Sequence, residues 1–270
     1  MSLNHYERIA AIYDLFVNTD YDVPFFVEEL DGITDPVLEL MAGTGRLTMP
    51  LLKAGFSVVA VDFSADMLSV LRSKLVQEGL TAELHEMDVT QLDLGRQFKK
   101  IIIPFQAFPE ITATNDQKRA LQAIFEHLEP GGEFVCTLHN PVVRMNAIDN
   151  QLRLATRQDL DHGGHLLVWL LQKRNPDTNV VEVMEFFEEY DANGVMTSKR
   201  YSPLQFHLLA RKDFQELVDE VGFEIVRIYG DYSRGAFSEE HSPFMIWILR
   251  RSNQQNTSRQ PDDVLIQSAC

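Results

Sequence analysis

Apolar and polar positions follow two different periods in the first half of the chain. Helical spacing marks a segment that ends near Gly55, one that Ser64 can cap, and one from about 116 to 128. Short runs that suit buried strands separate these segments, at 37–42, 57–62, 81–86, 101–104 and 133–138. Strands that alternate with helices predict a doubly wound, mostly parallel α/β sheet.

The period changes to a strand-like alternation between about 152 and 206. The clear strands are 165–173, 180–190 and 195–204, with turn-forming residues at 175–179 and 191–194 between them. A helix at 212–221 and strands at 223–229 and 244–250 then resume the α/β pattern. We predict a seven-stranded, Rossmann-like sheet whose cleft is covered by an antiparallel β insert.

This pattern divides the chain into segments. We expect cap helices in 1–30 that Pro24 interrupts, and a polar, disordered tail in 252–270. The ligand-binding core comprises 31–150 and 208–251, and the insert of 151–207 serves substrate binding, capping or dimerisation.

A glycine turn follows the first strand and indicates a nucleoside site. Gly43 and Gly45 let the backbone approach a ligand, and Asp62, at the end of the next strand, can accept hydrogen bonds from ribose hydroxyls. The third glycine of the dinucleotide fingerprint is replaced by Thr48, which disfavours NAD. Glu39 inside the strand is costly to bury, so a cationic ligand group or a free amine is expected to pair with it.

Four motifs in order carry a resemblance to a known family. Glu39-Leu-Met-Ala-Gly-Thr-Gly-Arg46, Val61–Met67, Glu86–Val89 and His127–Gly132 resemble the motifs of class I S-adenosylmethionine-dependent methyltransferases. The resemblance implies S-adenosylmethionine as cofactor, with Gly43 and Gly45 at its methionine part, Asp62 at the ribose, Asp88 at the adenine amino group and Val89 beside it. The other expected cofactor contacts are Tyr13, Glu39, Met41, Ala42, Arg46, Phe63, Ser64, Met67, Pro104 and Phe105.

The chain departs from the family pattern at two places. Met41 replaces a glycine or alanine, so its side chain must point away from the cofactor or narrow the pocket. Lys99 and Lys100 follow Phe98 where an acid is usual, which is expected to remove a polar group near the reaction centre.

Residues just past the fourth and fifth strands should face the transferred methyl group, because the ligand crevice of a doubly wound sheet lies beyond the carboxyl ends of its strands. Gln106 and His139 are the resulting candidates, with His139 as a general base. Tyr13 lies in a segment that resembles the mobile cap helix of small-molecule methyltransferases. Each of these two candidates has a purely structural alternative. Gln106 could be an ordinary loop amide, and His139 could be hydrogen-bonded to a backbone carbonyl.

Substrate contacts are predicted from the same crevice and from the insert. The candidates are Tyr21, Phe108, Asn140, Glu188 and Arg200. Phe108 could instead be a core aromatic, Glu188 part of a solvated strand face, and Arg200 a structural ion pair. The motifs around 200–203, 221–223, 229–232 and 242–245 resemble the C-terminal half of macrolide amino-sugar N-methyltransferases.

Composition restricts the classes of substrate and binding partner that we expect. Forty acids against 24 bases give a net charge of −16, which argues against nucleic acid as substrate. Two cysteines give neither a disulfide framework nor a metal site, and the Asp161–His165 segment lacks a third metal ligand. The sequence has no membrane-length apolar run and no signal-peptide pattern, so we expect a cytoplasmic protein and leave a homodimer open.

The combined interpretation is a methyltransferase that uses S-adenosylmethionine to methylate a nitrogen or oxygen of a small molecule. A cofactor-binding protein without catalysis is the first alternative, and an NAD-dependent oxidoreductase is the second.

Overall fold

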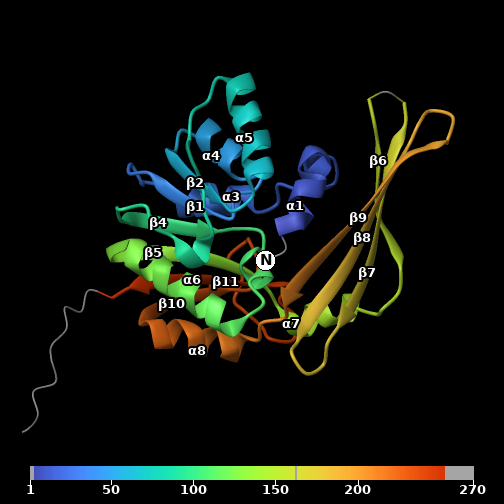
Figure 1. Cartoon of the computed structure of the whole chain (residues 1–270). Helices are drawn as coiled ribbons and strands as arrows, with labels where there is room; N and C mark the ends of the chain where they lie inside the picture. The colour runs from blue at the N-terminus through green and yellow to red at the C-terminus, as the bar shows by residue number, and fades with distance from the viewer. Residues whose placement is uncertain (1–2, 162, 253–270) are drawn as a thin grey trace, which may run out of the picture.

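The computed structural model describes residues 3–161 and 163–252, and its centre is a seven-stranded sheet with helices on both faces (Figure 1). The strand order is β10-β11-β5-β4-β1-β2-β3, with β11 antiparallel to β5 and β10. The strands are β1 Val37–Leu40, β2 Val58–Asp62, β3 Glu83–Glu86, β4 Phe98–Ile103, β5 Leu128–His139, β10 Phe223–Tyr229 and β11 Phe244–Arg251. The expected doubly wound, mostly parallel sheet is confirmed.

Both faces of the sheet are buried, because neighbouring residues of a strand enter different apolar layers. Leu38 and Leu40 pack with the side of α6 (Thr114–His127) and α8 (Arg211–Val221). Val37 packs with the other side, where α3 (Val23–Glu29), α4 (Thr48–Lys53) and α5 (Ala65–Glu78) lie. The two layers explain why these strands are continuous apolar runs rather than alternating ones.

The insert forms a second, antiparallel sheet of four strands in the order β6-β7-β8-β9. It stands beside the core (Figure 1). Its strands are β6 Arg153–Asp159, β7 His165–Arg174, β8 Val180–Tyr190 and β9 Met196–His207. The sequence pattern did not single out β6, whose side chains are mostly exposed and therefore lack a buried alternating face.

The N-terminal segment fills the space between the core and the second sheet. Its elements are α1 Leu3–Ile9, η1 Ala10–Ile12 and α2 Tyr13–Phe16, and Ile9 and Ile12 share an apolar cluster with Met67 of α5 and Phe187 of β8. Pro24 stands in the first turn of α3, where its missing N–H costs nothing, so it begins a helix instead of interrupting one. The N-terminal segment therefore contacts both parts of the molecule.

Short elements complete the fold: η2 Val89–Gln91, η3 Phe108–Glu110, α7 Pro141–Arg144 and η4 Met145–Ala147. Ser64 caps α5 as predicted, since its hydroxyl accepts the N–H of Met67. In the described part of the chain, no helix has the length and apolarity that crossing a membrane requires. His162 and the greater part of the predicted tail, 253–270, lie outside the described residues.

Candidate functional site

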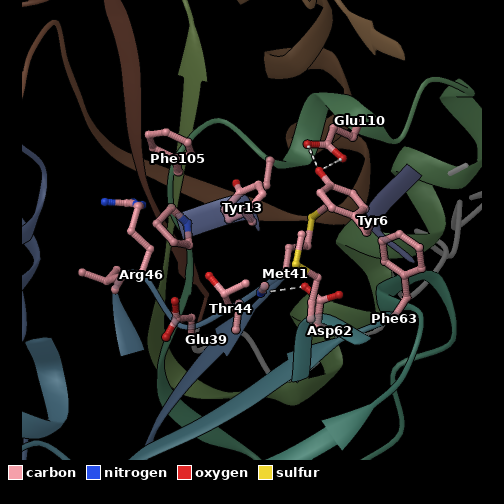
Figure 2. A pocket seen from close by; sticks show the side chains of 16 residues that line it. Tyr6, Tyr13, Glu39, Met41, Thr44, Arg46, Asp62, Phe63, Phe105 and Glu110 are labelled. Carbon is pink, nitrogen blue, oxygen red and sulfur yellow. Dashed lines mark hydrogen bonds between the residues drawn. The ribbon is translucent and has the colours of Figure 1, made fainter. Parts of the chain in front are cut away.

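A pocket opens at the carboxyl ends of β1, β2 and β4, at the edge of the sheet that the strand order favours for ligands (Figure 2). We call it the donor pocket. It is lined by Tyr6, Tyr13, Glu39, Met41, Ala42, Gly43, Thr44, Arg46, Leu47, Asp62, Phe63, Met67, Pro104, Phe105, Ala107 and Glu110. The structure thus brings together most of the residues that the sequence assigned to the cofactor.

The two glycines of the turn are needed for different structural reasons. Gly43 has a φ of +58°, and no atom lies within 4 Å of the place where a Cβ would stand, so its backbone borders open space in the pocket. A Cβ on Gly45 would stand 2.3 Å from Cδ1 of Leu71 in α5. Gly45 therefore lets α5 pack against the turn and does not line the donor pocket itself. Met41 has a φ of +58° and does line the pocket, so its side chain narrows the space.

Asp62 holds the glycine turn in place. Its carboxylate accepts the N–H of Gly43 at 2.8 Å and that of Ser64 at 2.9 Å. Burial raises the pKa of Asp62 to about 6, although these backbone bonds pull it down. A buried carboxylate with spare lone pairs at the pocket wall suits vicinal hydroxyls such as those of a ribose.

Glu39 has a partner that the sequence interpretation did not foresee. The hydroxyl of Thr48, which occupies the third-glycine position, donates to Glu39 Oε2 at 2.7 Å. Burial raises the pKa of Glu39 to about 7, and the Thr48 bond opposes that rise. An amine ligand is therefore not needed to satisfy this carboxyl, and one residue accounts both for the absent glycine and for the buried acid.

Arg46 joins the glycine turn to the N-terminal segment. Its guanidinium donates two hydrogen bonds of 2.6 Å to the buried Asp22 and a third of 3.1 Å to the carbonyl of Thr19. The guanidinium also lies 4.2 Å from the ring centroid of Phe105. Phe105 and Gln106 both have left-handed backbone with φ near +55°, which is unusual for two consecutive residues other than glycine and marks strain at the pocket wall.

Tyr6 and Glu110 lie in the donor pocket but were not predicted. The Tyr6 hydroxyl lies 2.7 and 2.6 Å from the two oxygens of Glu110, and the Tyr6 ring meets the edge of Phe63 (Figure 2). Burial raises the pKa of Glu110 to about 7, and the bond from Tyr6 opposes that rise. The two residues are 104 positions apart and belong to no motif, so only the tertiary fold identifies them as a pair.

A second cavity lies between the core and the inserted sheet, and we call it the acceptor cavity. Tyr6, Tyr13, Phe105 and Glu110 line both spaces, so the two adjoin. The remaining lining residues are His5, Ile9, Phe16, Val17, Tyr21, Gln106, His139, Arg144, Leu170, Gln172, Val183, Glu185, Leu204 and Phe206. All three predicted catalytic residues, Tyr13, Gln106 and His139, are therefore in one cavity, together with Tyr21.

Gln106 and His139 differ in the structure from the catalytic roles expected of them. Gln106 donates from Nε2 to the hydroxyl of Tyr232 at 2.8 Å, so its amide is already engaged. Burial, and next the nearby charge of Arg144, lowers the pKa of His139 to about 4. His139 is consequently neutral at physiological pH and is a weak base there.

Four predicted substrate residues lie away from both cavities. Phe108 is fully buried against Phe214 in the core. Asn140 caps α7 and donates to the carbonyls of Glu239 and Ser242. Glu188 pairs with Lys199, and Arg200 pairs with Glu189, so both belong to ion pairs of the inserted sheet.

Besides Gly45, three predicted cofactor residues do not line the donor pocket. Ser64 caps α5, Asp88 accepts the backbone N–H and the hydroxyl of Thr90, and Val89 is buried in the apolar core. Lys99 and Lys100 lie near the amino end of β4, whereas the pocket begins after its carboxyl end at Pro104. The missing acid therefore does not change the reaction centre, contrary to the expectation.

The residues present fit the cofactor that the sequence motifs imply. The open space beside Gly43 admits a ligand backbone, Asp62 offers acceptors for hydroxyls, and Tyr13 supplies an aromatic ring to the wall of the space that a sulfonium cation would occupy. Such a cation over an aromatic face gains about 0.5–2 kcal/mol.

Comparisons with known proteins agree with this site. Residues 37–132 match the family described as a methyltransferase domain. A putative methyltransferase, YqeM of Bacillus subtilis, is 22% identical over 84% of this chain and 90% of its own length. The dTDP-3-amino-3,4,6-trideoxy-alpha-D-glucopyranose N,N-dimethyltransferase of Streptomyces venezuelae is 29% identical over 47% of this chain and 55% of its own.

The fold is also found among solved structures. An S-adenosylmethionine-dependent methyltransferase from Clostridium acetobutylicum superposes with a TM-score of 0.77 at 21% identity, covering 92% of this chain and 99% of that one. The matched segment, 37–132, contains the glycine turn, Asp62 and Glu110. Residues 37–132 of this chain form a methyltransferase domain, and the whole chain has the fold of the solved methyltransferases it superposes on.

Proposed function

We propose that this enzyme methylates an amine nitrogen of a small molecule that binds in the acceptor cavity. The observation that carries the proposal is the shared wall of the two spaces, where Tyr6, Tyr13, Phe105 and Glu110 border both. A methyl donor on one side and an acceptor on the other would meet there, enclosed by aromatic side chains that exclude water.

Two acidic side chains favour nitrogen over oxygen as the acceptor atom. Glu185 of β8 and Glu110 line the acceptor cavity, and burial followed by the charge of Glu110 raises the pKa of Glu185 to about 8. His5 Nε2 lies 3.7 Å from Glu185, and burial lowers the pKa of His5 to about 4, so His5 supplies no positive charge at neutral pH. An ammonium ion would stabilise the ionised form of these two buried carboxyl groups, whereas a neutral alcohol would not.

The same carboxyl can perform the proton transfer that an amine requires. When bound, S-adenosylmethionine supplies an electrophilic methyl group, and an ammonium must lose a proton before its nitrogen can attack. Ionised Glu185, within the cavity, is the side chain we assign to accept that proton, because its raised pKa matches the operating pH. The Streptomyces venezuelae relative, whose name describes an N,N-dimethyltransferase of an amino sugar, supports nitrogen as the acceptor.

The test is release of S-adenosylhomocysteine with a panel of small amines and alcohols. We expect turnover with at least one amine, and kcat/KM that rises with pH through about 8 because Glu185 must be ionised. Glu185→Gln should lose this rise of kcat/KM with pH, and its kcat should fall about 100-fold or more. Glu182→Gln, an exposed acid on the same strand, is the matched control and should behave as wild type.

Stability separates loss of catalysis from loss of folding. Because the pKa of Glu185 is raised, the folded protein holds this proton more tightly than the unfolded chain, and the contribution of Glu185 to stability falls as pH rises from about 4.5 to about 8. Glu185→Gln should therefore be at least as stable as wild type at about pH 8. Cofactor binding without turnover on any amine or alcohol would contradict the proposal and favour a cofactor-binding protein without catalysis.

A further inference from the structure

The acceptor cavity contains a cation that the amine chemistry does not use. Arg144, the last residue of α7, donates from a terminal guanidinium nitrogen to Gln172 Oε1 at 2.8 Å. The guanidinium lies 5.4 Å from the ring centroid of Phe206, which also lines the cavity. Its protein contacts are thus a neutral amide and an aromatic face.

No carboxylate of the described residues lies within the 4.0 Å ion-pair distance of Arg144. Burial lowers the pKa of Arg144, and no acidic group offsets that effect. This is unexpected in a chain with 40 acids against 24 bases. A partly buried cation without a counter-ion is unfavourable, and a guanidinium has more N–H donors than one amide can engage.

We propose that Arg144, with Gln172 beside it, binds an anionic group of the acceptor, a carboxylate or a phosphate. The inference rests on the proposed function, because it places the amine and the anion on one molecule in one cavity. The planar fork of a guanidinium matches two oxygens of either anion, so the contact would orient the acceptor as well as hold it. The acceptor is then an amine-bearing anion, held at its acidic group by Arg144 and with its nitrogen facing Glu185 and Glu110.

The pKa of His139 can report whether an anion is bound to Arg144. Its ring lies in the acceptor cavity, stacks on Phe244 at 5.9 Å between centroids, and has a pKa that burial and then the charge of Arg144 lower to about 4. An anion bound to Arg144 would cancel part of that positive field. The pKa of His139 should therefore rise when the site is filled.

The experiment is an NMR titration of the histidine ring signals, with the donor pocket saturated by S-adenosylhomocysteine. Inorganic phosphate, diphosphate and acetate are added separately, with sodium chloride as the ionic-strength control. The variants are Arg144→Gln, Arg144→Lys and, as matched control, Arg72→Gln at an exposed position of α5. His139→Gln assigns the reporter signal.

We expect at least one anion to bind wild type and to raise the pKa of His139. Arg144→Gln should weaken that anion about tenfold or more, Arg144→Lys should retain more affinity than Arg144→Gln, and Arg72→Gln should match wild type. The tightest anion distinguishes a phosphorylated acceptor from a carboxylic acid. Unchanged His139 signals with all three anions, or equal affinity in Arg144→Gln, would overturn the inference.

Separate measurements test the proposed function. Calorimetry with S-adenosylhomocysteine should give the same affinity for wild type and Arg144→Gln, because Arg144 does not line the donor pocket. If amines give no turnover while the anions still shift His139, the anion site stands and the methylation proposal fails.

Discussion

Replacement of Asp62 by asparagine separates two roles of one carboxylate. The side chain accepts the N–H groups of Gly43 and Ser64 and is only 6% exposed. Asparagine has a single acceptor oxygen, so one of these two N–H groups loses its partner. The loss costs about 1–3 kcal/mol of folding free energy.

A second effect opposes this loss. The pKa of Asp62 is raised from 3.8 to about 6, so at about pH 8 the folded protein holds an ionised carboxylate at a cost near 3 kcal/mol, about 1.4 kcal/mol for each pKa unit. A neutral amide avoids that cost. The two effects are similar in size, and we expect Asp62→Asn to unfold in urea within about 1–2 kcal/mol of wild type.

Cofactor affinity should respond much more than stability. If ribose hydroxyls donate to Asp62, the amide variant loses a hydrogen bond to a charged acceptor and binds S-adenosylhomocysteine about tenfold or more weakly. Isothermal titration calorimetry at about pH 8 measures this, with the exposed Asp66→Asn of α5 as control. An affinity within about twofold of wild type in a folded Asp62→Asn protein would refute the ribose assignment and leave Asp62 as a clamp on the turn.

Two further pairs of substitutions test the packing around the site. Gly43→Ala and Gly45→Ala both place a side chain on left-handed backbone, so each should lose about 1 kcal/mol in urea unfolding. Gly45→Ala should lose about 1–3 kcal/mol more, since its Cβ would also overlap Leu71, whereas the Cβ of Gly43→Ala would enter the donor pocket and weaken cofactor binding. Equal losses of stability would contradict this distinction. Lys100→Met should cost about 1–3 kcal/mol because it removes the buried cation between Glu29 and Glu133, which then keep only Arg234 and Arg250 as partners. Lys99→Met breaks only an exposed pair and should leave the thermal unfolding midpoint nearly unchanged, so similar shifts in both variants would show that the buried pair is not special.

Features that depend on neighbouring residues were predictable from the sequence. The glycine turn, Asp62 and the Ser64 cap are all specified within a short strand–turn–helix segment, where local geometry determines which side chains meet. Gln106 and His139 were placed in the cavity by a general property of doubly wound sheets, whose ligand crevice lies beyond the strand ends.

Side-chain direction explains the principal errors. Glu188 and Glu185 lie on the same strand but three positions apart, and residues an odd number of positions apart point to opposite faces of a sheet. The sequence showed a run of acids on this strand but not which face the core would cover. Asn140 similarly follows the correct strand, yet its amide turns inward to cap α7.

Long-range pairs lay beyond any local pattern. Tyr6 and Glu110 come together because the N-terminal helices pack between the core and the inserted sheet, and neither residue belongs to a motif. The same packing brings Glu185 into a cavity with Glu110. The acid pair that supports an amine acceptor thus depends on how the insert sits on the core, and the order of elements does not specify that.

Three buried or partly buried cations of this acidic protein have different kinds of partner. Lys100 lies between two acids, and Arg46 forms a two-bond pair with the fully buried Asp22, so each has an internal counter-ion. Both also join separate elements, which is what a structural ion pair does. Arg144 is partly buried as well, but its polar partner is Gln172, a neutral amide. With acids in such excess, a counter-ion from the chain was readily available, and its absence at the wall of the acceptor cavity is best explained if the substrate provides it.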